Sequence, residues 1–123
     1  MKTNKVFIPH AVLIKKTDGT MDWKFDIERI KRAYGSIEPV VSSSQMMLTP
    51  DVCFSVIRQR FVESGFDPKT DYFLAAGDMT VYGAMLLIAA NEYGQSPKQL
   101  RHSKRYDSYD VLPYIDWRKS HGN

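Results

Sequence analysis

The stretch DYFLAAGD at residues 71–78, followed by the apolar segment MTVYGAMLLIAANEYG at residues 79–94, decides the fold. Residues 72–76 form a short run without charge, which favours a buried strand. Gly77 permits a sharp turn, and Asp78 is a residue type that caps a helix by accepting from its first N–H groups. Residues 79–91 also lack charge, so the helix they predict is apolar on nearly every side and belongs in the interior. Gly94 is placed to end that helix.

Length and composition indicate a single domain. With 123 residues, 43% of them hydrophobic and 25% charged, the chain can bury a core without staples. We predict one globular domain over residues 1–123, with a loose C-terminal tail at 116–123. Cys53 is the single cysteine, which favours a reduced, cytoplasmic setting. The apolar runs fall short of the roughly 18 residues that span a bilayer, so we expect no membrane partner.

Further strands and helices are predicted around this centre. Asp18-Gly19 indicates a hairpin turn, Asp26 and Gly35 bracket an amphipathic helix, and Thr49 precedes a helix that ends at Gly65. The strands are predicted at residues 11–14 (the first strand), 21–25, 36–41, 72–76 and within 98–116. Strands that alternate with helices predict a small α/β or α+β sandwich. We expect a mixed sheet of about four or five strands with three helices, in two or three layers.

The corner at Gly77 and Asp78 is the first candidate site. Ligands of open α/β sheets bind at the carboxyl ends of strands, and a helix start offers N–H groups to an anion. This position predicts a small nucleotide-binding or enzymatic site. The alternative is a plain helix cap, because the segment has one glycine and lacks the dinucleotide and phosphate-loop fingerprints.

The second candidate site is a basic and aromatic strip near the C-terminus, here called the C-terminal strip. Its residues are Lys98, Arg101, Lys104, Arg105, Tyr106, Tyr109 and Trp117. Positive charge interleaved with aromatic rings is typical of surfaces that contact phosphates and stack bases, and also of protein interfaces. Asp107 and Asp110 lie among these residues, so a mixed-charge edge strand is the structural alternative.

Other chemistry is not indicated. The acidic residues fit turn and cap roles, and His10, His102 and His121 are too far apart in sequence for metal-ligand spacing. Cys53 lies on the apolar face of a predicted helix, which favours an inert thiol. We therefore expect no catalytic residue, no metal and no cofactor.

Two resemblances to known families are present. Residues 12–33 resemble the opening of an ATP-cone module, with Lys15 and Lys16 in place of its basic, nucleotide-binding strand and Phe25-Asp26 before a helix. That family continues with helices whereas this sequence alternates strands and helices, so we treat the match as coincidental. Residues 26–115 resemble small uncharacterised proteins of tailed bacteriophages, through Ala33-Tyr34-Gly35, Asp71–Leu74 with Gly77-Asp78, and Leu100-Arg101 before a Tyr-rich strand.

The phage resemblance implies an accessory protein made during infection, in the cytoplasm of the host cell. It implies a non-enzymatic binding protein that docks on a host protein or protein complex and modulates or inhibits it. The C-terminal strip is the expected interface. RNA or DNA binding through the same strip is the first alternative, and a nucleotide or enzymatic site at Gly77-Asp78 is the second.

Overall fold

The structure, a computed structural model, describes residues 4–42, 49–103, 105–106 and 108–112. Its elements follow in the order β1 (Lys5–Ile8), β2 (Leu13–Lys15), β3 (Met21–Trp23), α1 (Ile27–Ala33), β4 (Ser36–Pro39), α2 (Pro50–Ser64), β5 (Tyr72–Leu74), α3 (Met79–Tyr93), β6 (Lys98–Ser103) and β7 (Ser108–Leu112). The predicted class, a small α/β or α+β fold with a mixed sheet and three helices, is confirmed for the described residues. The predicted tail at 116–123 lies outside them.

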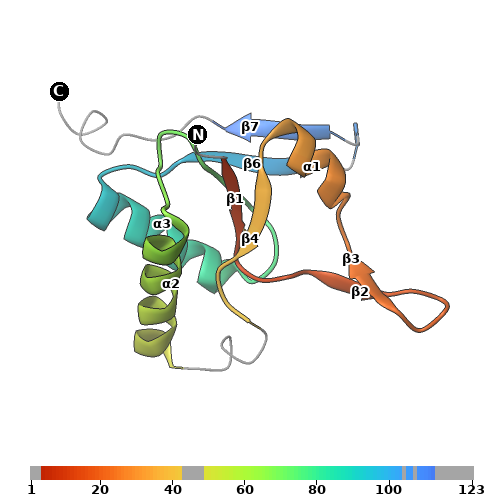
Figure 1. Cartoon of the computed structure of the whole chain (residues 1–123), viewed down its shortest axis with the longest axis horizontal. Coiled ribbons are helices and arrows are strands. Elements are labelled where there is room, and N and C mark those ends of the chain that lie inside the picture. Colours follow the sequence, from red (N-terminus) through yellow and green to blue (C-terminus); the bar gives the residue numbers. More distant parts are fainter. Residues whose placement is uncertain (1–3, 43–48, 104, 107, 113–123) are drawn as a thin grey trace.

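The main sheet has five strands in the order β4-β1-β5-β6-β7 (Figure 1). β1 is parallel to both of its neighbours, with Val6 opposite Ile37 of β4 and Tyr72 of β5. β6 continues the parallel set and β7 returns antiparallel to it. Each parallel connection carries a helix, which is the usual form of the crossover that parallel pairing requires. The hairpin β2–β3 forms a separate small sheet inside the first connection.

The prediction of the first strand at residues 11–14 was wrong. The first strand is β1, whose residues Val6, Phe7 and Ile8 are all fully buried. A central parallel strand is covered on both faces, so its apolar residues run on without alternation. Residues 13–15 instead belong to the exposed hairpin, where Leu13 and Ile14 are 44% and 48% exposed.

One face of the sheet is closed by α2 and α3. Phe7 and Phe73 point to this face and meet Phe61 of α2, with ring centroids 5.3 Å and 5.8 Å from that of Phe61. Phe66 stacks on Phe61 at 4.5 Å. Along α3, the buried residues are Val81, Tyr82, Ala84, Met85, Ile88 and Ala89. The prediction that this helix is largely interior is therefore confirmed. Among the described residues, no helix is long and apolar enough to cross a membrane.

The opposite face is covered by the short helix α1, which makes the fold three-layered. The neighbouring residues of the same strands, Val6, Ile8 and Leu74, pack here with Ile30 of α1. Gly35 joins α1 to β4 with a φ of 145°, and a Cβ atom at this position would overlap the backbone carbonyl of Asn4. Only glycine fits where the end of α1 approaches the chain this closely.

Helix ends follow the sequence signals. Asp26 accepts a hydrogen bond from the Arg29 N–H at 3.1 Å, and Asp78 accepts one from the Val81 N–H at 2.9 Å. Gly65 and Gly94 end α2 and α3 in left-handed backbone. Thr49 occupies the cap position of α2, but its side chain makes no capping hydrogen bond.

Candidate functional site

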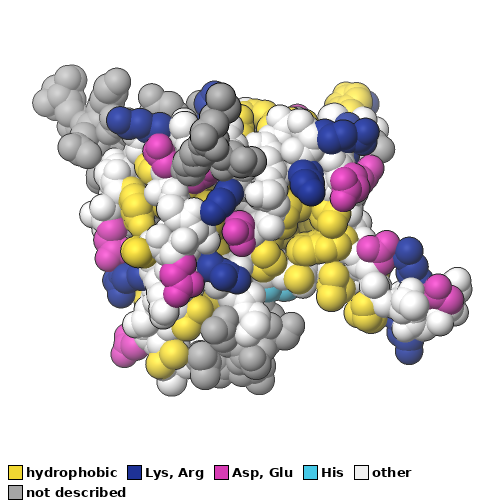
Figure 2. All heavy atoms as spheres, in the orientation of Figure 1, with side chains coloured by type: hydrophobic (Ala, Val, Ile, Leu, Met, Phe, Trp, Pro, Cys, Tyr) yellow, Lys and Arg dark blue, Asp and Glu magenta, His cyan; other side chains and the backbone are white. Residues whose placement is uncertain are grey.

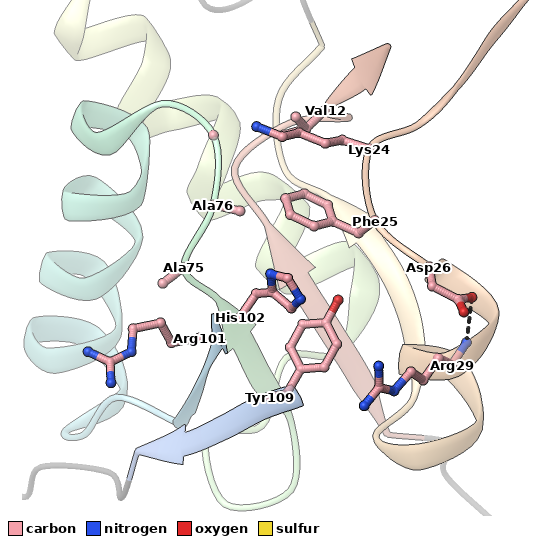
Figure 3. A pocket seen from close by; sticks show the side chains of 11 residues that line it. Val12, Lys24, Phe25, Asp26, Arg29, Ala75, Ala76, Arg101, His102 and Tyr109 are labelled. Atoms are coloured by element: carbon pink, nitrogen blue, oxygen red, sulfur yellow. Dashed lines mark hydrogen bonds between the residues drawn. The ribbon is translucent and has the colours of Figure 1, made fainter. Parts of the chain in front are cut away.

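A cleft of about 540 Å³ lies at the carboxyl ends of β5 and β6. Four parts of the chain form its walls (Figure 3). The hairpin base supplies Val12, Lys24 and Phe25, α1 and its cap supply Asp26 and Arg29, the turn after β5 supplies Ala75, Ala76 and Gly77, and the strands β6 and β7 supply Arg101, His102 and Tyr109. We call this site the cleft.

The cleft exists because neighbouring strands end at different points. β5 ends at Leu74, whereas β6 runs on to Ser103, paired with β7 from Ser108. The chain after β5 turns away at Gly77, which has a φ of 82°. The overhanging β6–β7 pair therefore forms one wall, and the hairpin base and α1 form the wall across from it.

Aromatic rings line the middle of the cleft. Tyr109 lies opposite His102 in the register of β6 and β7, and the two ring centroids are 5.2 Å apart. The ring of Tyr34, which follows α1, lies 6.5 Å from that of Tyr109, and the guanidinium carbon of Arg29 is 5.7 Å from the Tyr109 centroid. Figure 3 shows the His102 ring between those of Tyr109 and Phe25.

Charged side chains border these rings. Lys24, Arg29 and Asp26 line the cleft, and Asp26 is already engaged as the cap of α1. Arg101 also lines the cleft, but it precedes His102 in β6, so its side chain points away from the rings (Figure 3) and donates to Asp110 at 3.1 Å. Lys24 and Arg29 outnumber the carboxylate of Asp26, so the cleft carries a net positive charge, which favours an anionic ligand.

The two residues of the first predicted site, Gly77 and Asp78, have different places in the structure, because Gly77 lines the cleft and Asp78 does not. Gly77 lines the cleft, and a Cβ atom there would lie 2.7 Å from Nε2 of His10. Asp78 acts as the helix cap, and its own N–H donates to His10 Nε2 at 3.0 Å. His10 Nδ1 in turn lies 3.1 Å from the carbonyl oxygen of Ala11. Asp78 therefore holds the turn that borders the cleft.

The described residues of the C-terminal strip do not form one surface. Arg101 and Tyr109 lie in the cleft with Gly77, whereas Lys98 stands exposed at the opposite end of β6. Arg105 and Tyr106 form a separate exposed pair between β6 and β7, with the guanidinium carbon 5.4 Å from the ring centroid. The remaining two residues, Lys104 and Trp117, lie outside the described part of the chain.

The sequence analysis missed Lys24, Phe25 and Arg29 as site residues. Phe25 and Arg29 flank a helix start, where an apolar residue and a charged outer face are ordinary features. Their sequence positions carry no signal for the cleft, because Tyr109 and Arg101 reach them only through the order of strands in the sheet.

Cys53 and the acidic clusters add no reactive group to the cleft. Burial, and secondarily the negative charge of Asp78, raises the pKa of the half-buried Cys53 thiol and keeps it protonated. Among the described residues, no group of three or more His, Cys, Asp or Glu side chains is arranged to hold a metal ion.

A second feature is the hairpin β2–β3, which projects from the body of the protein (Figure 1). We call it the arm. Leu13, Ile14 and Met21 are 44%, 48% and 58% exposed on it. In Figure 2, hydrophobic side chains also gather between α1, β4 and the base of the arm.

Polar contacts fix the shape of the arm. Asp18 accepts from the hydroxyl and the N–H of Thr20, and these bonds lower its pKa. Lys16 Nζ lies 3.0 Å from the Asp22 carboxylate, and its hydrogen bond is the main cause of the lowered pKa of Asp22. The arm is therefore an ordered element that presents apolar side chains.

Comparison with known proteins gives one match. The model of the family described as phage Pam3 gp32-like protein matches residues 4–114. This match confirms the predicted resemblance to small phage proteins and extends it to nearly the whole chain. No curated protein and no solved structure matches the chain.

Proposed function

Because the chain belongs to the phage Pam3 gp32-like protein family, we propose that it works during infection as a non-enzymatic binding protein. Its partner is a host protein or protein complex, which it modulates or inhibits by docking. The place of action is the host cytoplasm.

The observation that carries this proposal is the apolar surface of the arm. Leu13 and Met21 are large apolar side chains about half exposed to water, on an element that stands away from the core. Exposed apolar patches of this kind mark interaction sites, because they cost solvation free energy that a partner removes. An isolated two-stranded hairpin is only marginally stable, so we infer that the arm serves to contact a partner.

The backbone of the arm offers a second means of contact. Within the described residues, β2 and β3 pair only with each other, so each strand has one open edge. A partner strand can add to such an edge through main-chain hydrogen bonds, while pockets for alternate side chains provide specificity. Apolar side chains and an open strand edge on one element together favour a protein partner.

The test is capture from bacterial lysate with tagged wild-type protein and two variants, each with and without nuclease. The arm variant carries Leu13→Ser and Met21→Ser. The control, Val62→Ser, changes a side chain that is 73% exposed on α2, away from the arm. We expect wild type and control to capture a stoichiometric protein that survives nuclease and that the arm variant loses.

Two results would contradict the proposal. Equal capture by the arm variant would remove the arm as the interface. Capture that disappears with nuclease, and that weakens steeply between low and moderate salt, would assign the binding to nucleic acid, because salt competes with phosphate contacts.

A further inference from the structure

The cleft combines a planar aromatic centre with a cationic border. In Figure 3 the rings of Phe25, His102 and Tyr109 lie in the middle, with the charged ends of Lys24 and Arg29 near them and that of Arg101 pointing away. Lys24, Arg29 and Arg101 come from three different elements or loops, yet all line this one cavity. A ligand that matches this arrangement has a flat apolar ring and an anionic group attached to it.

Arg29 is suited to an anionic ligand as well as to its aromatic neighbour Tyr109, because a guanidinium has five N–H donors. The Asp26 carboxylate accepts from the first turn of α1 and so is held at the wall of the cleft. Arginine prefers phosphate and carboxylate because its planar fork pairs with two oxygens at once.

The aromatic groups suit a nucleobase. Bases stack on tyrosine, histidine and phenylalanine rings because every base has a π face. Tyr109 contacts the rings of Tyr34, at 6.5 Å, and of His102, at 5.2 Å, so its position is set before a ligand arrives. A preformed platform lowers the ordering cost of binding.

Position and size agree with a ligand of this class. The cleft lies at the carboxyl ends of parallel strands, where open α/β sheets bind their ligands. Its volume of about 540 Å³ falls within the range of sites for small molecules and cofactors.

We propose that the cleft binds a nucleotide, with the base against Tyr109 and the phosphate toward Arg29 and Lys24. The nucleotide is either free or the end of a single strand, because both present the same base and phosphate. This proposal does not depend on which partner the exposed side chains of the arm contact, so it stands or falls separately from the proposed function.

The test is equilibrium titration of the full chain with AMP, ATP, adenosine, inorganic phosphate and a short single-stranded oligonucleotide, supported by thermal unfolding. We expect AMP and ATP to bind saturably and to raise the melting temperature, since a ligand of the folded state stabilises it. Adenosine and phosphate, which each carry half of the recognised chemistry, bind at least about tenfold more weakly.

Matched arginine variants locate the site. Arg29→Gln is compared with Arg58→Gln, because each guanidinium carbon lies 5.7 Å from an aromatic centroid, that of Tyr109 or that of Phe54. Arg58 is on α2, paired with Glu92, and outside the cleft. We expect Arg29→Gln to weaken AMP binding at least about tenfold and Arg58→Gln to leave it unchanged. Tyr109→Leu gives a second test, aimed at stacking.

The outcomes separate cleanly. Tighter binding of the oligonucleotide than of AMP, with the same dependence on Arg29, supports the site and identifies a strand end as its ligand. No saturable binding of AMP, ATP or the oligonucleotide overturns the proposal. Phosphate that binds as tightly as AMP, or equal losses in the two arginine variants, overturns it as well.

Discussion

The two faces of the main sheet are built from the same strands and differ in what covers them. Phe7 and Phe73 face α2 and α3, each 15 residues long, and are sealed in a cluster of stacked and edge-on rings. Val6 and Leu74 face α1, which has seven residues. The short helix leaves part of this face to the cleft and to the exposed apolar side chains beside the arm (Figure 2).

This difference separates stability from binding. A face covered by long helices buries more apolar surface and so contributes more to the free energy of folding. A face with a short cover retains concave surface, and its side chains come from segments distant in sequence. We therefore expect substitutions on the α2–α3 face to act on stability, and substitutions around the cleft and arm to act on binding.

The largest expected effect is that of Phe61→Ala on the sealed face. Phe61 is fully buried, and its centroid lies 4.5 Å from that of Phe66. Removing a buried ring leaves a cavity, so we expect a loss of about 3–5 kcal/mol in the free energy of unfolding. Phe25→Ala, at the half-buried cleft, should cost only about 1 kcal/mol. Urea unfolding of both variants measures the difference, and equal losses would remove the contrast between the faces.

Gly35→Ala tests the connection between the short helix α1 and β4. The substitution combines a φ of 145° with overlap of the Asn4 carbonyl, which belongs to backbone and cannot rotate away. We expect a loss of about 2–4 kcal/mol by thermal or urea unfolding. Gly83→Ala in α3 is the control, since a Cβ there meets no atom within 4 Å. Alanine at that position should stabilise by about 0.5–1 kcal/mol.

Tyr82→Phe removes one polar contact from the sealed face. The Tyr82 hydroxyl donates to Oε1 of Gln99 at 2.6 Å, so the variant leaves a partly buried acceptor without its donor. We expect a loss of about 1–2 kcal/mol near neutral pH, measured by urea unfolding. An unchanged midpoint would mean that water replaces the hydroxyl.

The same variant has a pH signature. Burial raises the pKa of Tyr82 above its ordinary value of 10.0. Above about pH 10 the unfolded chain releases the Tyr82 proton that the folded chain keeps. The contribution of the protonated Tyr82 hydroxyl to the free energy of unfolding is therefore complete below about pH 10 and is lost as the pH rises further. Between about pH 9 and about pH 11, wild type should lose more stability than Tyr82→Phe. Parallel curves for the two proteins would contradict this assignment.

Ile14→Ser should have the smallest effect on stability. Ile14 is 48% exposed on the arm, where a substitution removes little buried surface. We expect the free energy of unfolding to change by less than about 0.5 kcal/mol. A loss above about 1 kcal/mol in urea unfolding would show that the arm packs on the body.

Local signals in the sequence predicted the helices well. Asp26 and Asp78 cap them, and Gly65 and Gly94 end them, because capping depends on residues within one turn. β1 was missed although Val6, Phe7 and Ile8 are a continuous apolar run. The burial that identifies this run as a central strand comes from its pairing with two strands far along the chain.

The candidate site was predictable only in part. Gly77 was found from the rule that ligands bind where strands end, and Arg101 and Tyr109 were found from composition. Arg101 and Tyr109 lie near Gly77 because β6 is next to β5 in the sheet. The spacing of these residues in the sequence does not predict that order of strands. Phe25 and Arg29 enter the cleft because α1 and the segment before it pack beside the end of β5, again a tertiary property.

The central place of β1 sets the order in which the protein assembles during synthesis. Its partners are β4 at residues 36–39 and β5 at residues 72–74, and the Lys5 N–H donates to Asp71 at 3.0 Å. Pairing between strands this distant is slow, because long loops must close first. During synthesis, Val6, Phe7 and Ile8 can pair with β4 first, but their second edge stays open until β5 has been made. Chains interrupted before residue 74 therefore present an aggregation-prone segment.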